Sequence, residues 1–104
     1  MQKEIENLKV WQRGMTLAKT VYAVTRDFPK EELYGIVSQM RRAAVSVPAN
    51  IAEGKGRQYS KEFKQFLNVA QGSLYELMTL IRLAKEVGLL AEIDASKLES
   101  ECQE

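Results

Sequence analysis

The sequence predicts an all-α protein, an up-down four-helix bundle with a short fourth helix and a Pro-kinked second helix. Apolar residues recur at alternating spacings of three and four along three long segments, which is the signature of amphipathic helices. No segment shows the two-residue alternation of a half-buried strand. The connections between the segments are short, and short connections favour antiparallel neighbours.

The first predicted helix runs from about Leu8 to Thr25 and has two neighbouring apolar stripes. The first stripe comprises Val10, Gly14, Leu17, Val21, Val24 and Phe28. The second stripe comprises Trp11, Met15, Ala18, Tyr22 and Thr25. Because a helix in an isolated small bundle needs only one apolar face, the second stripe is either a wide core face or a contact between subunits.

The second predicted helix runs from about Lys30 to Glu53, after Pro29, which suits a first helical turn. Its apolar stripe comprises Leu33, Val37, Met40, Ala44, Val47 and Ile51. Pro48 lies inside this helix and removes the hydrogen bond to the carbonyl of Ala44, at a cost of about 3 kcal/mol. We therefore expect a kink between Ala44 and Pro48, either shaped to its neighbours or without functional meaning.

The third predicted helix runs from about Ser60 to Val87, after Gly54 and Gly56, and Gly88 ends it. Its core stripe comprises Phe63, Leu67, Ala70, Leu74, Leu77, Ile81 and Ala84. A second stripe comprises Phe66, Val69, Ser73, Leu80, Leu83 and Val87. This second stripe is again either part of a wide core face or the surface of a homo-oligomer.

A fourth helix of about two and a half turns is predicted near the C-terminus. Asp94 is a plausible cap, and Leu98 and Cys102 share a face at a spacing of four residues. Cys102 is the single cysteine, so it forms no internal disulfide, and we expect it to be half-exposed. Glycines inside the predicted helices each cost roughly 1 kcal/mol relative to alanine, so we expect close packing at these positions. They are Gly14, Gly35 and Gly72.

The length and composition indicate one globular domain over residues 1–104, with a core over about residues 8–90. Of the 104 residues, 28% are charged and 45% are hydrophobic, which is ordinary for a soluble protein. No apolar run approaches the roughly 20 residues that span a bilayer, and the N-terminus lacks the apolar core of a signal peptide. We therefore expect a cytoplasmic protein that does not contact a membrane.

Residue types that carry catalysis or bind metals are scarce. The chain has no histidine, which is the commonest general base and metal ligand, and one cysteine cannot build a thiolate metal site. The glycine-containing residues 54–57 follow a helix rather than a strand and lack the spacing of a phosphate-binding loop. We expect no catalytic residues, no metal and no cofactor, and therefore no enzyme.

The net charge is only +1, but the charges are unevenly distributed. Residues 41–64 contain six basic residues against Glu53 and Glu62, whereas residues 92–104 contain five acidic residues against Lys97. The basic region could contact the phosphates of RNA or DNA, and an aromatic side chain could stack on a base. The candidate residues are Arg41, Arg42, Lys55, Arg57, Tyr59, Lys61 and Lys64. The alternative is an ordinary charged loop.

Polar residues follow one side of the second predicted helix. Glu76, on the second stripe of the third helix, would be a costly lone carboxylate if it were buried. Arg41 or Arg42 could satisfy this carboxylate with two hydrogen bonds, so we predict such a pair. The candidate polar network comprises Gln39, Arg42, Asn50, Glu53 and Glu76. The alternative is a solvated helix face.

Several local patterns together resemble one family. They are Val10-Trp11-Gln12, Phe28-Pro29 with Glu32, the long motif from Gln39 to Gly54, Glu62-Phe63 with Phe66-Leu67, and Gly72-Ser73-Leu74 with Glu76-Leu77. Over about Leu8 to Leu90, the chain strongly resembles the bacterial four-helix-bundle proteins encoded in intervening sequences of 23S ribosomal RNA genes. The long motif, QMRRAAVSVPANIAEG, is the most specific of these patterns.

The resemblance implies a four-helix bundle that assembles as a homopentamer and whose biochemical function is largely unassigned. A related branch, the accessory variability proteins of diversity-generating retroelements, is similar in fold and five-fold assembly. That branch is associated with a reverse transcriptase and with nucleic-acid binding through a basic surface. Family members commonly continue into a longer fourth helix, whereas this chain stops at Glu104.

Two functions remain open at this point. The first is a homo-oligomer that binds RNA or DNA, in which five copies multiply the few phosphate contacts of one subunit. The second is a symmetric protein-interaction scaffold with no direct nucleic-acid binding, whose partner could be a nucleic-acid enzyme such as a reverse transcriptase. Exposed apolar residues outside the stripes would favour the scaffold, and the candidates are Tyr34, Leu89 and Leu90.

Overall fold

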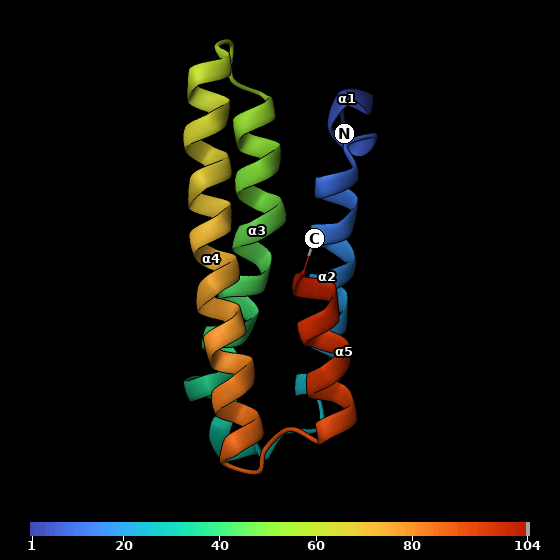
Figure 1. Ribbon diagram of the computed structural model, residues 1–104, viewed down its shortest axis with the longest axis vertical. Coiled ribbons are helices and arrows are strands. Elements are labelled where there is room, and N and C mark those ends of the chain that lie inside the picture. The colour runs from blue at the N-terminus through green and yellow to red at the C-terminus, as the bar shows by residue number, and fades with distance from the viewer. Residues whose placement is uncertain (104) are drawn as a thin grey trace.

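A computed structural model describes residues 1–103 of the chain (Figure 1). The helices are α1 (Lys3–Glu6), α2 (Lys9–Thr25), α3 (Ser38–Lys55), α4 (Ser60–Glu86) and α5 (Glu92–Cys102). A 3-10 segment, η1 (Lys30–Glu32), and a π-helical segment, η2 (Leu33–Val37), join α2 to α3. No strand occurs within the described residues, and the predicted all-α class is confirmed.

The four longer helices lie side by side, which is compatible with a helical bundle (Figure 1). α3 packs against both α2 and α4, and α5 packs against the same two helices. α5 has 11 residues and α4 has 27, so these helices are about 16 and 40 Å long. The hairpin formed by α3 and α4 therefore extends well beyond the end of α5. Within residues 1–103, no helix combines the length and apolar character that crossing a bilayer requires.

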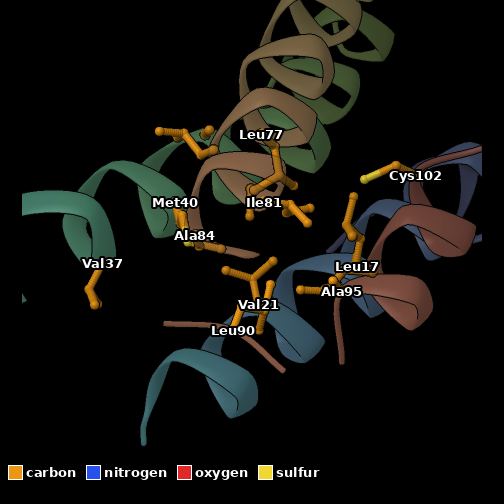
Figure 2. Close-up of a cluster of buried hydrophobic side chains, with 14 of the residues drawn as sticks. Leu17, Val21, Val37, Met40, Leu77, Ile81, Ala84, Leu90, Ala95 and Cys102 are labelled. Carbon is orange, nitrogen blue, oxygen red and sulfur yellow. The ribbon is translucent and has the colours of Figure 1, made fainter. Parts of the chain in front are cut away.

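The main hydrophobic core lies between α2, α3, α4 and α5 (Figure 2). Its largest fully buried side chains are Val21, Met40, Leu77, Ile81 and Leu98. A smaller cluster further along the α3–α4 hairpin comprises Val47, Ile51 and Ala70, with Leu8 and Trp11 packed against it. All of these residues except Leu8 belong to the predicted apolar stripes or to the predicted face of the fourth helix. Val10 and Leu33 belong to the same stripes but are 45% and 43% exposed, so apolar periodicity identified most of the buried faces.

The second stripe of α4 lies mostly on the surface. Val69, Leu83 and Val87 are about half exposed, whereas Leu80 is buried. A wide core face therefore explains Leu80 but does not explain the other three residues. Their apolar side chains remain in contact with solvent in the single chain.

The second predicted helix is not a continuous α-helix from Lys30, and this expectation was wrong. Gly35 has non-helical dihedral angles (φ −114°, ψ −113°), and the regular α-helix begins only at Ser38. Glycine is among the weakest helix formers, so a break is least costly at this residue. The segment before Ser38 instead consists of η1 and η2.

Pro48 does not interrupt the α-helix, which continues through it to Lys55. The non-helical residue of the second predicted helix is Gly35, whereas the backbone between Ala44 and Pro48 stays α-helical, and the kink expected there stays a prediction. The ring of Pro48 is buried against α2 at Gly14, where an added Cβ would lie 3.3 Å from the Cβ of Pro48. The close packing expected at Gly14 is confirmed, and it places the proline ring directly against the neighbouring backbone.

Within the chain, the expectation of close packing was wrong at Gly35, where an added Cβ would meet only Oε1 of Glu32 at 3.8 Å, and at Gly72, where it would have no neighbour within 4 Å. The closest approach occurs instead at Gly54, near the end of α3. A Cβ at Gly54 would lie 2.6 Å from the Cβ of Phe66 and 3.0 Å from Cδ1 of Phe63. The absence of a side chain at Gly54 therefore allows α3 and α4 to meet at the end of their hairpin.

Cys102 is buried at the C-terminal end of α5, so the expectation of half exposure was also wrong. Burial, reinforced by the charges of Glu101 and Glu99, raises the pKa of this thiol from 9.0 to about 11. The folded chain therefore disfavours the thiolate, which is the reactive form of cysteine.

Replacing Gly54 with alanine should lower the free energy of unfolding by about 2 kcal/mol, because the new methyl group overlaps Phe66 and the two helices must shift apart. Urea denaturation measures this change. Gly56→Ala is the matched control, because its Cβ would approach only the carbonyl oxygens of Ala52 and Glu53, at 3.6 Å. Wild-type stability of Gly54→Ala would contradict the close approach of α3 and α4.

Cys102 should be alkylated slowly by iodoacetamide near neutral pH, and its rate should rise with a midpoint near pH 11. Because the unfolded thiol loses its proton first, this group should also reduce the stability of the fold as the pH rises from about 9 to about 11. Mass spectrometry after timed alkylation, in native buffer and in urea, measures both states. Equal rates in the two conditions would contradict the burial of the thiol.

Candidate nucleic-acid interface

The seven candidate nucleic-acid-binding residues do not form one patch, because they fall into two groups along the hairpin. The hairpin-end group comprises Lys55, Arg57, Tyr59, Lys61 and Lys64. Arg41 and Arg42 lie at the other end of α3. Arg41 and Lys55 are fourteen residues apart in sequence, which is about 21 Å along a helix. One phosphate group cannot be contacted by both groups at once.

Two aromatic rings of α4 organise the cations of the hairpin end. The Lys55 ammonium lies 5.7 Å from the centre of the Phe63 ring, and the Arg57 guanidinium lies 5.0 Å from that of Phe66. Arg57 also donates a 2.8 Å hydrogen bond to the carboxylate of Glu53. Cation–π contacts of this kind hold a charge over a ring face and leave its outer side in water. These cation–π contacts of Phe63 and Phe66 were not predicted from the sequence.

The side chains of Tyr59, Lys61 and Lys64 are exposed to solvent. Tyr59 precedes α4 and is 62% exposed, and both lysines are exposed in the first two turns of the helix. Neither lysine forms an ion pair within residues 1–103. These three residues therefore have the exposure that phosphate contact and base stacking need.

Arg41 is held by α2 and is half-buried, unlike the residues of the hairpin end. Its Nε donates a 3.0 Å hydrogen bond to Oγ1 of Thr25, and its guanidinium lies 4.6 Å from the centre of the Tyr22 ring. The Thr25 hydroxyl in turn donates a 2.7 Å hydrogen bond to the carbonyl of Val21. Among residues 1–103, Thr25 is the one buried polar residue, and a threonine in an apolar stripe was the sequence signal for this link.

Arg42 and Glu76 line the same hollow of about 460 Å³ between α3 and α4. Gln39 and Ser73 also line this hollow. The structure records no ion pair between Glu76 and either arginine within the described residues. The predicted Glu76–Arg pair is therefore not formed within one chain, because Glu76 is exposed and water solvates its carboxylate.

Part of the predicted polar network exists, with different partners. The Ser46 and Ser73 hydroxyls are 2.7 Å apart and link α3 to α4. Asn50 donates hydrogen bonds to the carbonyl of Ser46 at 2.8 Å and to its hydroxyl at 2.9 Å. Glu53 pairs with Arg57 and does not join these residues. Ser46 and Ser73 were both missing from the predicted network, and the small polar side chain of Ser73 within an apolar stripe was an available signal.

Of the apolar residues expected to favour a scaffold, Tyr34 remains a candidate and the leucines do not. Tyr34 is 93% exposed, in η2. Leu90 is buried in the main core, and Leu89 packs against that core. The leucines after α4 therefore cover the end of the bundle.

A family model described as 23S rRNA-intervening sequence protein matches residues 6–104. The chain belongs to this family. The match confirms the resemblance inferred from the motif between Gln39 and Gly54, and it covers α2 to α5 together with the hairpin end. No curated protein matches the sequence.

In this family member, Arg41 should contribute to stability through Thr25. Thr25→Val keeps the shape of the side chain and removes the acceptor, so it should lower the free energy of unfolding by about 1 kcal/mol. Arg41→Met should have a similar effect, and the double variant should cost less than the sum of the two single changes. Urea denaturation of the four proteins measures the coupling, and strict additivity would contradict it.

Proposed function

We propose that the chain is a non-enzymatic, cytoplasmic subunit of a homopentamer that binds RNA or DNA through the hairpin end of each copy. Each subunit would form an up-down four-helix bundle, and five hairpin ends would lie on one ring. The five-fold assembly is carried over from the resemblance to the family, whose members form such rings. We propose no catalytic residue, metal or cofactor for this subunit.

The proposal rests on the exposure of Tyr59, Lys61 and Lys64. They belong to the same hairpin end as Lys55 and Arg57, whose cations lie over aromatic rings of α4. Four basic residues in this segment outnumber Glu53 and Glu62, so the hairpin end is locally basic although the chain is nearly neutral. One such end offers few phosphate contacts and would bind weakly. Five ends on one particle would act together through a high effective concentration.

The hairpin end supports binding of a phosphate backbone better than reading of a sequence. Lysines contact phosphates as point charges, and a tyrosine stacks on any base because every base has a π-face. Arg57, the arginine of the hairpin end, already contacts other residues of the protein, because it pairs with Glu53 and covers the ring of Phe66. We therefore expect little sequence preference and a strong dependence of affinity on salt.

The test is the affinity of the protein for labelled single- and double-stranded RNA and DNA at several salt concentrations. Light scattering on the same material gives the mass of the particle. Affinity that falls steeply with salt supports phosphate contact by an assembled basic surface. No binding at low salt would overturn the nucleic-acid proposal.

The double variant Lys61→Gln/Lys64→Gln should weaken binding and flatten its salt dependence. Loss of two phosphate contacts in each subunit should reduce the slope of log affinity against log salt by about 1.8 for duplex DNA and about 1.4 for single strands, for every subunit that contacts the nucleic acid. Lys19→Gln/Lys97→Gln is the matched control, because these exposed lysines lie on α2 and α5. An equal loss of affinity in both double variants would mean that only total charge matters and that the hairpin end is not the site.

A protein-interaction scaffold is the second candidate, and the exposure of Tyr34 favours it. In that case, the chain would dock another protein, for example a reverse transcriptase, without touching nucleic acid itself. Two results together would support the scaffold. The wild-type chain, but not Tyr34→Ala, should capture a protein partner from its own host, and the wild-type chain should not bind the labelled RNA or DNA.

A further inference from the structure

We propose that the outward face of α4 in one copy docks into a hollow between α2 and α3 of a second copy. This inference rests on the proposed homo-oligomer and assigns its subunit contact. The α4 face comprises Val69, Gly72, Tyr75, Glu76, Leu83 and Val87. The α2–α3 face comprises Tyr22, Leu33, Tyr34, Arg41, Arg42 and Val45.

The α4 face is apolar and has no partner within the chain. Val69, Tyr75, Leu83 and Val87 are between 48% and 60% exposed. Val69, Leu83 and Val87 lie near one line along about five turns of α4, and Tyr75 lies beside that line, on the side of the helix away from the buried Ile81. Single exposed apolar residues are common on protein surfaces, but several of them gathered on one helix face favour an interaction site.

Gly72 lies at the centre of this stripe, and nothing within the chain explains it. A Cβ at this position would have no neighbour within 4 Å, so alanine would fit the monomer freely. Alanine would also favour the helix by roughly 1 kcal/mol in this exposed, central position. A glycine in the middle of a helix allows another backbone or a large side chain to approach closely, and here that group must come from another molecule.

The α2–α3 face is hollowed, and residues of η2 complete its lining. Its residues line a hollow of about 570 Å³ that opens to solvent. Tyr22, Leu33, Tyr34 and Val45 give it exposed apolar walls. Arg41 is already oriented by its hydrogen bond to Thr25 and its contact with the Tyr22 ring, so little side-chain ordering would be needed on docking.

The charges of the two faces favour a second copy as the occupant. The α4 face carries the carboxylate of Glu76 among its apolar residues, and the α2–α3 face carries the guanidinium groups of Arg41 and Arg42. A single chain therefore provides both halves of a complementary pair. Contact between two different faces is heterologous, and repeated heterologous contacts form a ring when the rotation between copies closes.

This assignment gives Glu76 and the two arginines a role that the single chain does not provide. The sequence predicted a Glu76–Arg pair, and the structure forms none within the described residues of one chain. The pair would instead form between copies, where docking removes water and strengthens charge-assisted hydrogen bonds. Arg41 and Arg42 then serve assembly, and phosphate contact is left to the hairpin end.

The test blocks one face at a time with the same new residue. Gly72→Arg places a long cation on the α4 face, opposite the two arginines of the neighbour. Val45→Arg fills the hollow of the α2–α3 face. Ile93→Arg is the matched control, because Ile93 is 78% exposed on α5, outside both faces. Far-UV circular dichroism confirms the helical fold of each variant, and Leu83→Arg replaces Gly72→Arg if that variant fails to fold.

By light scattering, each blocked variant alone should have the monomer mass of 11.8 kDa, and the control should keep the wild-type mass. A mixture of the two blocked variants should form a 1:1 dimer of twice the monomer mass, because each supplies the intact face that the other lacks. A Val45→Arg protein that stays assembled, or a mixture that stays monomeric, would overturn the assignment.

The outcome for the wild type separates this inference from the proposed function. A monomeric wild type would overturn both the homo-oligomer and its contact. An oligomeric wild type whose mass is unchanged by both Gly72→Arg and Val45→Arg would overturn only the contact proposed here.

Discussion

Close contact of α3 with its two neighbours is the constraint on which the rest of the structure depends. α3 meets α2 where the Pro48 ring packs at Gly14, and it meets α4 where Gly54 faces Phe66. At both points, a missing side chain allows two helices to approach until their atoms touch. Dispersion and apolar burial grow with such contact, and they offset the poor helix propensity of glycine and proline. The orientation of the hairpin follows from these two positions.

The hairpin geometry also determines where charge can gather. Because α3 and α4 extend past the end of α5, their connection stands clear of the main core (Figure 1). The same contact at Gly54 brings Phe63 and Phe66 beside Lys55 and Arg57. The two rings that pack at the end of the hairpin therefore also form cation–π contacts with its basic side chains. Stability and a basic surface thus arise from one packing arrangement. At the other end of α3, Arg41 is drawn into contact with α2 instead.

Much of the fold could be predicted because it depends on local spacing. The apolar stripes placed Val21, Met40, Leu77 and Ile81 in the core, where they are fully buried. The break near Gly35 was missed because a glycine in a periodic segment is compatible with both a packed helix and a broken one. The candidate site was only partly predictable, since most of the length of α3 separates Arg41 and Arg42 from the other five candidate residues. The partners of Arg41, Asn50 and Arg57 could not be inferred, because each depends on which helix faces it.

By itself, the sequence determined the helical class, the buried face of each longer helix, the basic character of residues 41–64 and the family. These properties follow from periodicity, composition and a specific motif, all of which are local in the chain. Only the tertiary structure decided which glycines lie at close contacts within the chain. Gly14 and Gly54 lie at such contacts, and Gly72 does not. The physical reason is that a glycine has no side chain to show its environment, so its role depends entirely on the distance to the neighbouring atoms.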